Sequence, residues 1–325
     1  MDWNRMAHRA LDGKTLSNTE ALAILEAPDQ QVLSILQAAF LVRHRHAGMK
    51  VRVHVLQNAK SGACPEDCTF CTQSAHYQTE SAVYRRQSVE ELVAGARRAV
   101  GMGAVTYCMV TATRSPSADD LETMCAAARA IKKQYNIKLC ASLGLLEADK
   151  ARALAAAGID RYNHNLETSA RHFPEVCSTH DFSSRVATVR AAREAGMEAC
   201  CGGIMGMGEN LEDRVDLALT LHELGVESIP VNFLDPRPGT PLDHCERMSP
   251  TDALRTLAMV RLTNPQATDI RMAGGREVVL ESMQPLALYP ANSLFTHGYL
   301  TTGGQEPSSD LAMIHAAGFE PEVLE

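Results

Sequence analysis

Residues 51–71 read VRVHVLQNAKSGACPEDCTFC, and this stretch sets the expectation for the whole fold. Its first part, Val51–Gln57, alternates valine with other residues and predicts a β-strand. Its second part is a loop that places Cys64, Cys68 and Cys71 in the spacing C-x3-C-x2-C, with no fourth cysteine nearby. In a parallel barrel such a loop lies at the carboxyl end of its strand, which is where barrel active sites lie.

Seven further β-rich runs follow this strand and alternate with helical segments. The predicted strands are Ala104–Val110, Ile137–Leu143, Ile159–Asn165, Met197–Gly202, Ser228–Leu234, Thr268–Ala273 and Ala291–His297. The predicted helices are Val89–Met102, Asp120–Tyr135, Ala148–Ala157, Ser184–Ala195, Glu212–Leu224, Pro250–Leu262, Arg276–Leu286 and Ser309–Ala317. Strands that each precede a helix predict an α/β fold, a single closed (β/α)8 barrel of the TIM type.

The residues before the first strand read as a helical extension of the barrel. Ser17-x-x-Glu20 forms a capping-box pattern at the start of an apolar-periodic stretch, and a second such stretch follows around residues 33–40. We therefore expect residues 1–48 to form helices that cap the barrel, and residues 49–325 to form the barrel itself, without a linker between them.

Composition limits the partners of the chain. Its 325 residues are 45% hydrophobic, enough for one large barrel core, and the net charge of −8 comes from interspersed acidic and basic residues. There is no basic stripe for nucleic acid, no polybasic anchor and no run long enough to span a membrane, so neither partner is expected. Ten cysteines without a secretion signal argue against a disulfide framework and favour the reducing cytoplasm.

The three-cysteine loop predicts an open metal cluster. An iron–sulfur cube held by four thiolates is closed, whereas three ligands leave one iron open. A structural zinc site usually takes four protein ligands in paired C-x2-C units, and the second pair is missing here. The spacing resembles that of the radical S-adenosylmethionine (SAM) enzymes. This resemblance implies that Cys64, Cys68 and Cys71 hold a 4Fe–4S cluster whose open iron chelates the amino acid end of SAM. A zinc site or a cysteine-rich turn is the alternative.

Two further motifs fit a SAM site. Phe70 lies between the second and third loop cysteines, where radical SAM enzymes place an aromatic residue against the adenine. The run that begins at Gly202 has the pattern G-x-I-x-G-x-x-E, which resembles the cofactor-contacting motif of the superfamily and points to Gly203 and Ile204. Glycines there let the backbone approach a ligand closely. The alternative for Phe70 is ordinary packing.

Polar residues alternate along the fourth predicted strand. Asn163, Asn165 and Glu167 are two residues apart, so they share one face. On an inward face they need partners, because an unsatisfied buried polar group costs about 1–3 kcal/mol. Glu167 suits ribose hydroxyls, with Asn165 beside it. Asn163, Asn165 and Asn232 of the sixth strand suit a neutral, urea-like substrate group. A structural polar layer is the alternative.

Three more cysteines fall on predicted strands. Cys108, Cys140 and Cys200 lie on the second, third and fifth strands, and barrel closure brings such positions together inside. Arg271 lies on the seventh strand; since arginine is almost always protonated, physical chemistry alone makes it a charge partner rather than a metal ligand. Alternation turns Cys201 outward. No role is assigned to Cys125, Cys177, Cys201 or Cys245.

The whole set resembles the biotin synthases, a family within the radical SAM superfamily, over nearly the full chain. The resemblance rests on the residues Gly62–Cys68 with Gln73-Ser74, Tyr162–Thr168, Gly202–Ile204, Pro238–Leu242, Ala291–Ser293 and Tyr299–Thr302. Two residues depart from the common pattern. Glu167 stands where Asp is common and is one methylene longer, and Phe70 stands where Tyr also occurs.

This resemblance implies the function. Such an enzyme inserts sulfur into dethiobiotin to form biotin, the final step of biotin biosynthesis. It implies a homodimer, a small flavodoxin or ferredoxin as reductant, and a 2Fe–2S cluster that donates the sulfur and is held by Cys108, Cys140, Cys200 and Arg271. Chemistry is then carried by the clusters, and no side chain is expected to act as acid or base.

Two alternatives have distinct signatures. Another barrel-type radical SAM enzyme, such as one that forms methylornithine or serves hydrogenase maturation, shares the first cluster but does not need the interior cysteines. A non-catalytic zinc or iron–sulfur scaffold does not need the asparagine set of the fourth and sixth strands.

Overall fold

The structure is a computed structural model that describes residues 1–301 and 303–324. Its strands are β1 (Lys50–Lys60), β2 (Thr106–Thr111), β3 (Lys138–Ser142), β4 (Arg161–Asn163), β5 (Glu198–Cys200), β6 (Gly203–Met205), β7 (Ser228–Phe233), β8 (Asp269–Met272), β9 (Ser293–Phe295) and β10 (Glu320–Pro321). Thr302, part of the quoted Tyr299–Thr302 stretch, and Glu325 lie outside the described residues.

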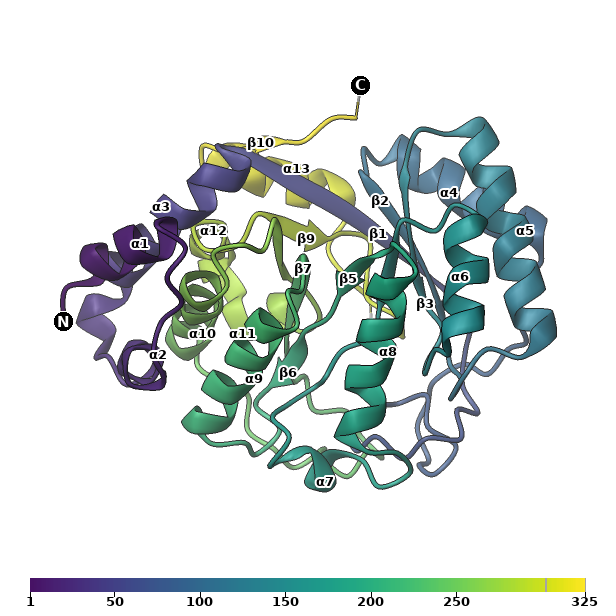
Figure 1. The fold of residues 1–325 in the computed structure, drawn as a ribbon, viewed down its shortest axis with the longest axis horizontal. Coiled ribbons are helices and arrows are strands. Elements are labelled where there is room, and N and C mark those ends of the chain that lie inside the picture. Colours follow the sequence, from purple (N-terminus) through teal and green to yellow (C-terminus); the bar gives the residue numbers. More distant parts are fainter. Residues whose placement is uncertain (302, 325) are drawn as a thin grey trace.

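Helices cover the outside of these strands (Figure 1). They are α1 (Trp3–Leu11), α2 (Asn18–Leu25), α3 (Val32–Ala47), α4 (Val89–Gly101), α5 (Ala118–Gln134), α6 (Ala148–Ala156), α7 (Phe173–Val176), α8 (Phe182–Glu194), α9 (Leu211–Glu223), α10 (Pro250–Thr263), α11 (Arg276–Leu280), α12 (Gln284–Ala287) and α13 (Pro307–Ala316). The 3-10 turns η1 (Asp29–Gln31) and η2 (Glu281–Met283) complete the set given for the described residues.

The strands close into a parallel barrel. Their order is β1-β2-β3-β4-β5-β7-β8-β9, every pairing is parallel, and β1 also pairs with β9. The short β6 continues the line of β5 and pairs with β7, while β10 pairs with the start of β1. The predicted closed (β/α)8 barrel is therefore confirmed, with the fifth strand in two pieces.

The fifth strand is interrupted at two glycines that the packing requires. A Cβ atom on Gly202 would lie 1.9 Å from the carbonyl oxygen of Pro230, and one on Gly203 would lie 2.4 Å from that of Glu167. The backbone thus approaches both neighbouring segments more closely than any side chain allows. The predicted strand over Met197–Gly202 contains β5, but the prediction missed the continuation β6.

A second prediction that fails is the single helix over Arg276–Leu286. The chain forms α11, then η2, then α12. Glu281 has a positive φ of 48°, and Pro285 has no backbone N–H to donate to a continuing helix. Both features interrupt the helical hydrogen-bond ladder.

The N-terminal helices lie on the outer side of the barrel. The Ser17–Glu20 capping box is present at the start of α2, as predicted. Helix α3 packs on α10 and α1, and α2 packs on α9 and α10 (Figure 1). Their apolar residues join the core that lies between the sheet and the helices α9 and α10. The division into residues 1–48 and 49–325 stays a prediction.

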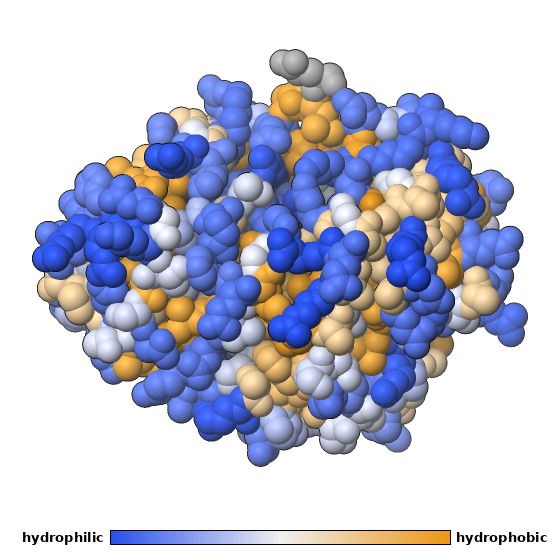
Figure 2. All heavy atoms as spheres, viewed as in Figure 1, coloured by the Kyte–Doolittle hydropathy of each residue, from blue (hydrophilic) through white to orange (hydrophobic). Residues whose placement is uncertain are grey.

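The surface is mixed in character. Polar residues cover much of the face in Figure 2, with apolar residues between them. Among the described residues, no helix is both long and apolar enough to cross a membrane.

Candidate active site

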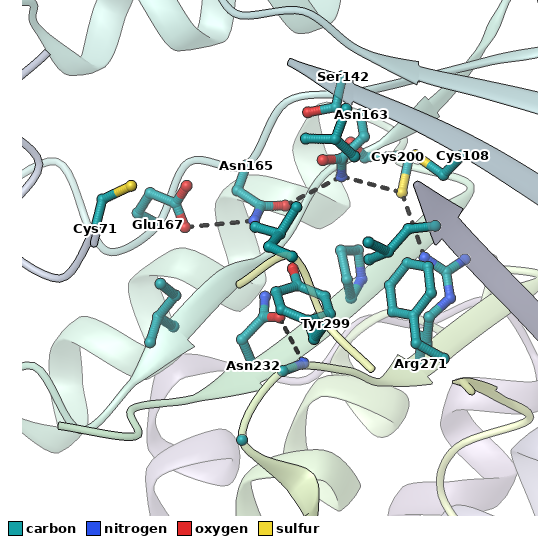
Figure 3. A pocket seen from close by; sticks show the side chains of 18 of the residues that line it. Cys71, Cys108, Ser142, Asn163, Asn165, Glu167, Cys200, Asn232, Arg271 and Tyr299 are labelled. Atoms are coloured by element: carbon teal, nitrogen blue, oxygen red, sulfur yellow. Dashed lines mark hydrogen bonds between the residues drawn. The ribbon is translucent and has the colours of Figure 1, made fainter. Parts of the chain in front are cut away.

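A cavity of about 250 Å³ lies inside the barrel and opens at the carboxyl ends of the strands. Most of the predicted site residues line it, and Figure 3 shows many of them facing one another. The predicted residues in its wall are Phe70, Cys71, Cys108, Cys140, Asn163, Asn165, Glu167, Cys200, Ile204, Asn232 and Arg271. Cys64, Cys68 and Gly203 are not among the described residues that line it.

The three-cysteine loop is held by its own backbone. The amide of Cys64 donates to the carbonyl of Gln73 at 3.0 Å, its carbonyl accepts from the amide of Ala75 at 2.8 Å, and the amide of Cys71 donates to the carbonyl of Cys68 at 3.0 Å. Burial raises the pKa of Cys71 to about 11, and the neighbouring Cys64 adds to the rise. These contacts fold the loop so that its thiols lie near one another.

A second segment anchors this loop from the outside. The carboxylate of Asp67 accepts the backbone amides of Ser178 and Thr179 at 2.9 and 3.1 Å. Burial opposes the charge of Asp67, but these amides and the side chains of Ser178 and Cys177 overcome it and lower the pKa. The chain between α7 and α8 is therefore tied to the loop by a charged group.

Sequence reasoning missed Arg185, which lies where the loop meets the cavity. Its Nη2 is 3.6 Å from Cys68 Sγ, and its Nη1 donates to the carbonyl of Asn165 at 2.7 Å and to Glu167 Oε1 at 3.3 Å. The residue is 5% exposed and lines the cavity. An arginine on an amphipathic helix carries no motif, so nothing local in the sequence singles it out.

Cys177 also lies at this place, 3.8 Å from Cys68 Sγ. The hydrogen bond from Cys68 lowers the pKa of Cys177 to about 4. The ligand atoms of Glu66, Cys177 and His180 are within 4.8 Å of one another. However, Arg185 Nε donates to His180 Nε2 at 2.9 Å, so the imidazole proton sits on Nδ1 and points to Glu66. That tautomer favours a hydrogen-bonded cluster over a metal site.

A chain of hydrogen bonds begins at the end of β4 and continues along the segment that follows it. Asn163 Nδ2 donates to Asn165 Oδ1 at 3.3 Å, and Asn165 Nδ2 donates to Glu167 Oε2 at 3.4 Å (Figure 3). Burial raises the pKa of Glu167, although Arg185 and Asn165 oppose the rise. All three side chains line the cavity, but β4 ends at Asn163, so the predicted strand over Ile159–Asn165 is too long and Glu167, with a positive φ of 70°, is not in strand geometry.

Asn232 is held by backbone groups. Its Nδ2 donates to the carbonyl of Gly203 at 3.1 Å, and its Oδ1 accepts the amide of Gly274 at 2.9 Å. An amide group has a second N–H and a second lone pair. Asn232 therefore presents a fixed donor and acceptor pair in the cavity wall.

The apolar end of the cavity contains Phe70 and Ile204. Phe70 packs with Phe173, Val176 and other apolar side chains, and its ring lines the cavity. Gly203 lies directly behind, where its close approach to Glu167 aligns the amide of Ile204 with the carbonyl of Glu167 at 2.8 Å.

The three interior cysteines meet as the barrel prediction required. Cys108 and Cys140 are register partners on β2 and β3. The thiols of Cys140 and Cys200 are close enough to shift one another's pKa, and Cys200 of strand β5 lines the same cavity as the other two. Cys201, next in the chain, points instead into the apolar core under the helices. These thiols and Arg271 line the same cavity as Cys71.

Arg271 faces this second thiol set. Its Nη1 is 3.8 Å from Cys200 Sγ, and its Nε is buried without a hydrogen-bond partner among the described residues. Burial disfavours the charged guanidinium, but Asp269 and Cys200 overcome this and raise the pKa of Arg271. The guanidinium therefore lies beside the thiol of Cys200 with one nitrogen, Nε, unsatisfied among the described residues.

Comparison with known proteins agrees with this geometry. The Radical SAM superfamily pattern matches residues 59–221, and that of the Biotin and Thiamin Synthesis associated domain matches residues 230–320. A biotin synthase of Salinibacter ruber (strain DSM 13855 / M31) is 58% identical over 99% of this chain and 90% of its own. The chain belongs to the biotin synthase family. A biotin synthase of Bacillus cereus (strain B4264) is 43% identical over 99% of this chain and 96% of its own.

Solved structures share the fold of this biotin synthase family member. A methylornithine synthase superposes with a TM-score of 0.85 at 18% identity, covering 98% of this chain and 97% of its own. A FeFe-hydrogenase maturase from Carboxydothermus hydrogenoformans gives 0.83 at 17% identity, covering 99% and 80%. At these identities, both comparisons show a shared fold only.

Family membership makes the chain a sulfur-inserting radical SAM enzyme that uses SAM and iron–sulfur clusters. The alternative of a non-catalytic scaffold is therefore wrong.

Proposed function

We propose that two iron–sulfur clusters, held by two separate sets of three thiols along one cavity, insert sulfur into dethiobiotin to form biotin in this biotin synthase. The observation that carries the proposal is the second set, Cys108, Cys140 and Cys200 with Arg271, inside the same cavity as Cys71. An enzyme that only generates a radical has no need of that second set.

The donor set of the loop fits a 4Fe–4S cluster. Cys64, Cys68 and Cys71 supply three soft ligands, and the fourth thiol nearby, that of Cys177, comes from a different segment and lies 3.8 Å from Cys68 Sγ. The hydrogen bond to Cys177 raises the pKa of Cys68 well above its ordinary value, and burial adds to this. Arg185 places a positive charge beside Cys68, which offsets the negative charge that bound thiolates bring.

The second set fits a 2Fe–2S cluster. Cys108, Cys140 and Cys200 supply three ligands, and the guanidinium of Arg271, whose Nη1 lies 3.8 Å from Cys200 Sγ, is the group that completes them. Arginine is an unusual ligand, and its assignment rests on the family resemblance together with this contact. When bound, the first cluster with SAM supplies hydrogen-atom abstraction, and the second supplies the sulfur.

The protein groups position the two small molecules. Glu167 and Asn165 accept and donate hydrogen bonds at the ribose of SAM, and Phe70 and Ile204 give its adenine an apolar surface. Gly203 acts through its backbone, since it permits the approach of Ile204. Asn163 and Asn232, with Asn165, bind the urea-like ring of dethiobiotin through paired donors and acceptors.

The barrel wall also excludes water from this chemistry. His164 and His54 are buried, and burial lowers the pKa of each well below its ordinary value. They are therefore neutral at pH 7 and supply no acid for proton transfer.

By family resemblance we also propose a homodimer, a flavodoxin or ferredoxin as the electron donor, and a cytoplasmic location. Sedimentation of the purified protein tests the homodimer.

Neighbouring cysteines allow a sharp test of the second set. Cys200→Ala removes one cavity thiol, whereas Cys201→Ala removes the adjacent thiol that packs in the core. We expect Cys200→Ala to lose the second cluster and biotin formation but to keep SAM cleavage. Iron and sulfide analysis with mass spectrometry of biotin and 5′-deoxyadenosine measures this. Biotin from Cys200→Ala, or loss of the second cluster in Cys201→Ala, contradicts the assignment.

A parallel test addresses the first set. Cys68→Ala removes the buried middle ligand, and we expect 5′-deoxyadenosine formation to fall below detection. Cys125→Ala is the matched control, because that thiol is buried against helix α6, where it donates to the carbonyl of Ala153 at 3.6 Å. Persistent 5′-deoxyadenosine from Cys68→Ala shows that the loop has been misassigned.

A further inference from the structure

Asp269 is a fully buried carboxylate at the base of the second thiol set. It lies at the start of β8 and has no exposed surface. Its Oδ2 accepts from Arg271 Nη2 at 2.7 Å, from Arg161 Nη1 at 2.7 Å and from Ser228 Oγ at 3.0 Å. Its Oδ1 accepts from Ser293 Oγ. One carboxylate thus joins two guanidinium groups from β4 and β8.

The two arginines use this carboxylate differently. All three guanidinium nitrogens of Arg161 donate to carboxylates, because Nε and Nη2 also donate to Glu198 at 3.0 and 2.6 Å. Arg271 donates to oxygen atoms through Nη2, to Asp269 at 2.7 Å and to Ser228 at 3.0 Å. Its Nη1 donates toward Cys200 Sγ at 3.8 Å, and its Nε has no hydrogen-bond partner among the described residues.

Contacts at Nη2 constrain where Nη1 of Arg271 points. The guanidinium also lies over the ring of Phe295, with 4.7 Å from Cζ to the ring centroid. The charged hydrogen bond from Nη2 to Asp269 adds a directional constraint on the same group. In this arrangement Nη1 lies 3.8 Å from Cys200 Sγ.

We propose that Asp269 is a positioning residue for the second cluster: it orients Arg271 toward the three cavity thiols and holds Arg161 as a second cation beneath them. Arg161 belongs to this arrangement because it is the register partner of Cys140 on the adjacent strand. The inference rests on the proposed 2Fe–2S site. Groups that fix metal ligands from behind typically change metal affinity or activity by about 10–100-fold when mutated.

Asp269→Asn tests the proposal, because it keeps the shape and removes the charge. The full chain, reconstituted without oxygen, is followed by iron and sulfide content, absorption and the midpoint potential of the second cluster. We expect loss of that cluster during dialysis to be at least about tenfold faster, with a shifted spectrum and potential. The first cluster and 5′-deoxyadenosine formation serve as internal controls and should not change.

Asp310→Asn is the matched control for a buried aspartate. Asp310 also binds a buried arginine, Arg276, at 2.7 and 2.9 Å, and a threonine hydroxyl, but it does not line the cavity. It should reduce stability without changing the spectrum of the second cluster. If Asp269→Asn fails to fold, Ser228→Ala removes one contact from both Asp269 and Arg271, and a smaller change in the same direction is expected.

Different outcomes test the positioning role of Asp269 and the existence of the second cluster site. Wild-type protein that holds two clusters, with Asp269→Asn or Ser228→Ala unchanged in spectrum, potential and rate of loss, overturns the positioning role alone. Wild-type protein that holds only the first cluster overturns the proposed second site and, with it, this inference. Equal changes in Asp269→Asn and Asp310→Asn also overturn it, since they reveal a general structural effect.

Discussion

Arg185 and Glu167 form a buried ion pair that connects the cluster loop to the polar segment that follows β4. Their side chains are 6% and 10% exposed, with Nη1 and Oε1 3.3 Å apart. Removing the partner of a buried charge leaves that charge uncompensated, which is costly. Arg185 therefore fixes both the position and the charge of Glu167.

Replacing Arg185 with methionine should weaken SAM binding. Arg185→Met frees Glu167 and the carbonyl of Asn165 from their common donor, so the proposed ribose contacts lose their alignment. We expect an affinity loss of at least about tenfold, or about 1.4 kcal/mol, by titration calorimetry. Arg193→Met on the same helix is the control, because Arg193 is half-exposed and binds the carbonyl of Leu224. Equal affinities for the two variants would rule out the role.

At the scale of elements, the split fifth strand depends on the absence of side chains. A Cβ atom on Gly203 would meet Leu217 Cδ2 at 2.6 Å as well as the carbonyl of Glu167. Gly203→Ala should therefore cost about 1–3 kcal/mol of unfolding free energy, the usual range for overpacking. Denaturant unfolding measures this. Gly101→Ala, where nothing lies within 4 Å, should be neutral or stabilising, and similar losses at both positions would contradict the steric account.

The geometry of single elements decides which site residues could be predicted from the sequence. Alternation separated Cys200 from Cys201, because strand geometry is local. It also predicted a shared face for Asn163, Asn165 and Glu167, and all three line the cavity, although β4 ends at Asn163 and Glu167 has a positive φ. It could not find Arg185 or Asp269. Their roles depend on segments that meet only after the barrel closes.

At the scale of the whole molecule, the barrel was predictable because eight β-rich runs alternate with amphipathic helices. Regular alternation of strands and helices is compatible with few topologies. The split strand and the broken α11–α12 segment were not, since close backbone approaches and a positive φ depend on neighbours distant in sequence. The closed barrel is what brings two cysteine sets, far apart in the chain, to one cavity.

The central claim is that these two sets act together on one substrate. The most direct measurement is an anaerobic assay of the reconstituted chain with dethiobiotin, SAM and a strong reductant, followed by mass spectrometry. We predict that biotin and 5′-deoxyadenosine form together. Formation of 5′-deoxyadenosine without biotin, while the second cluster is shown to be intact, would contradict the account.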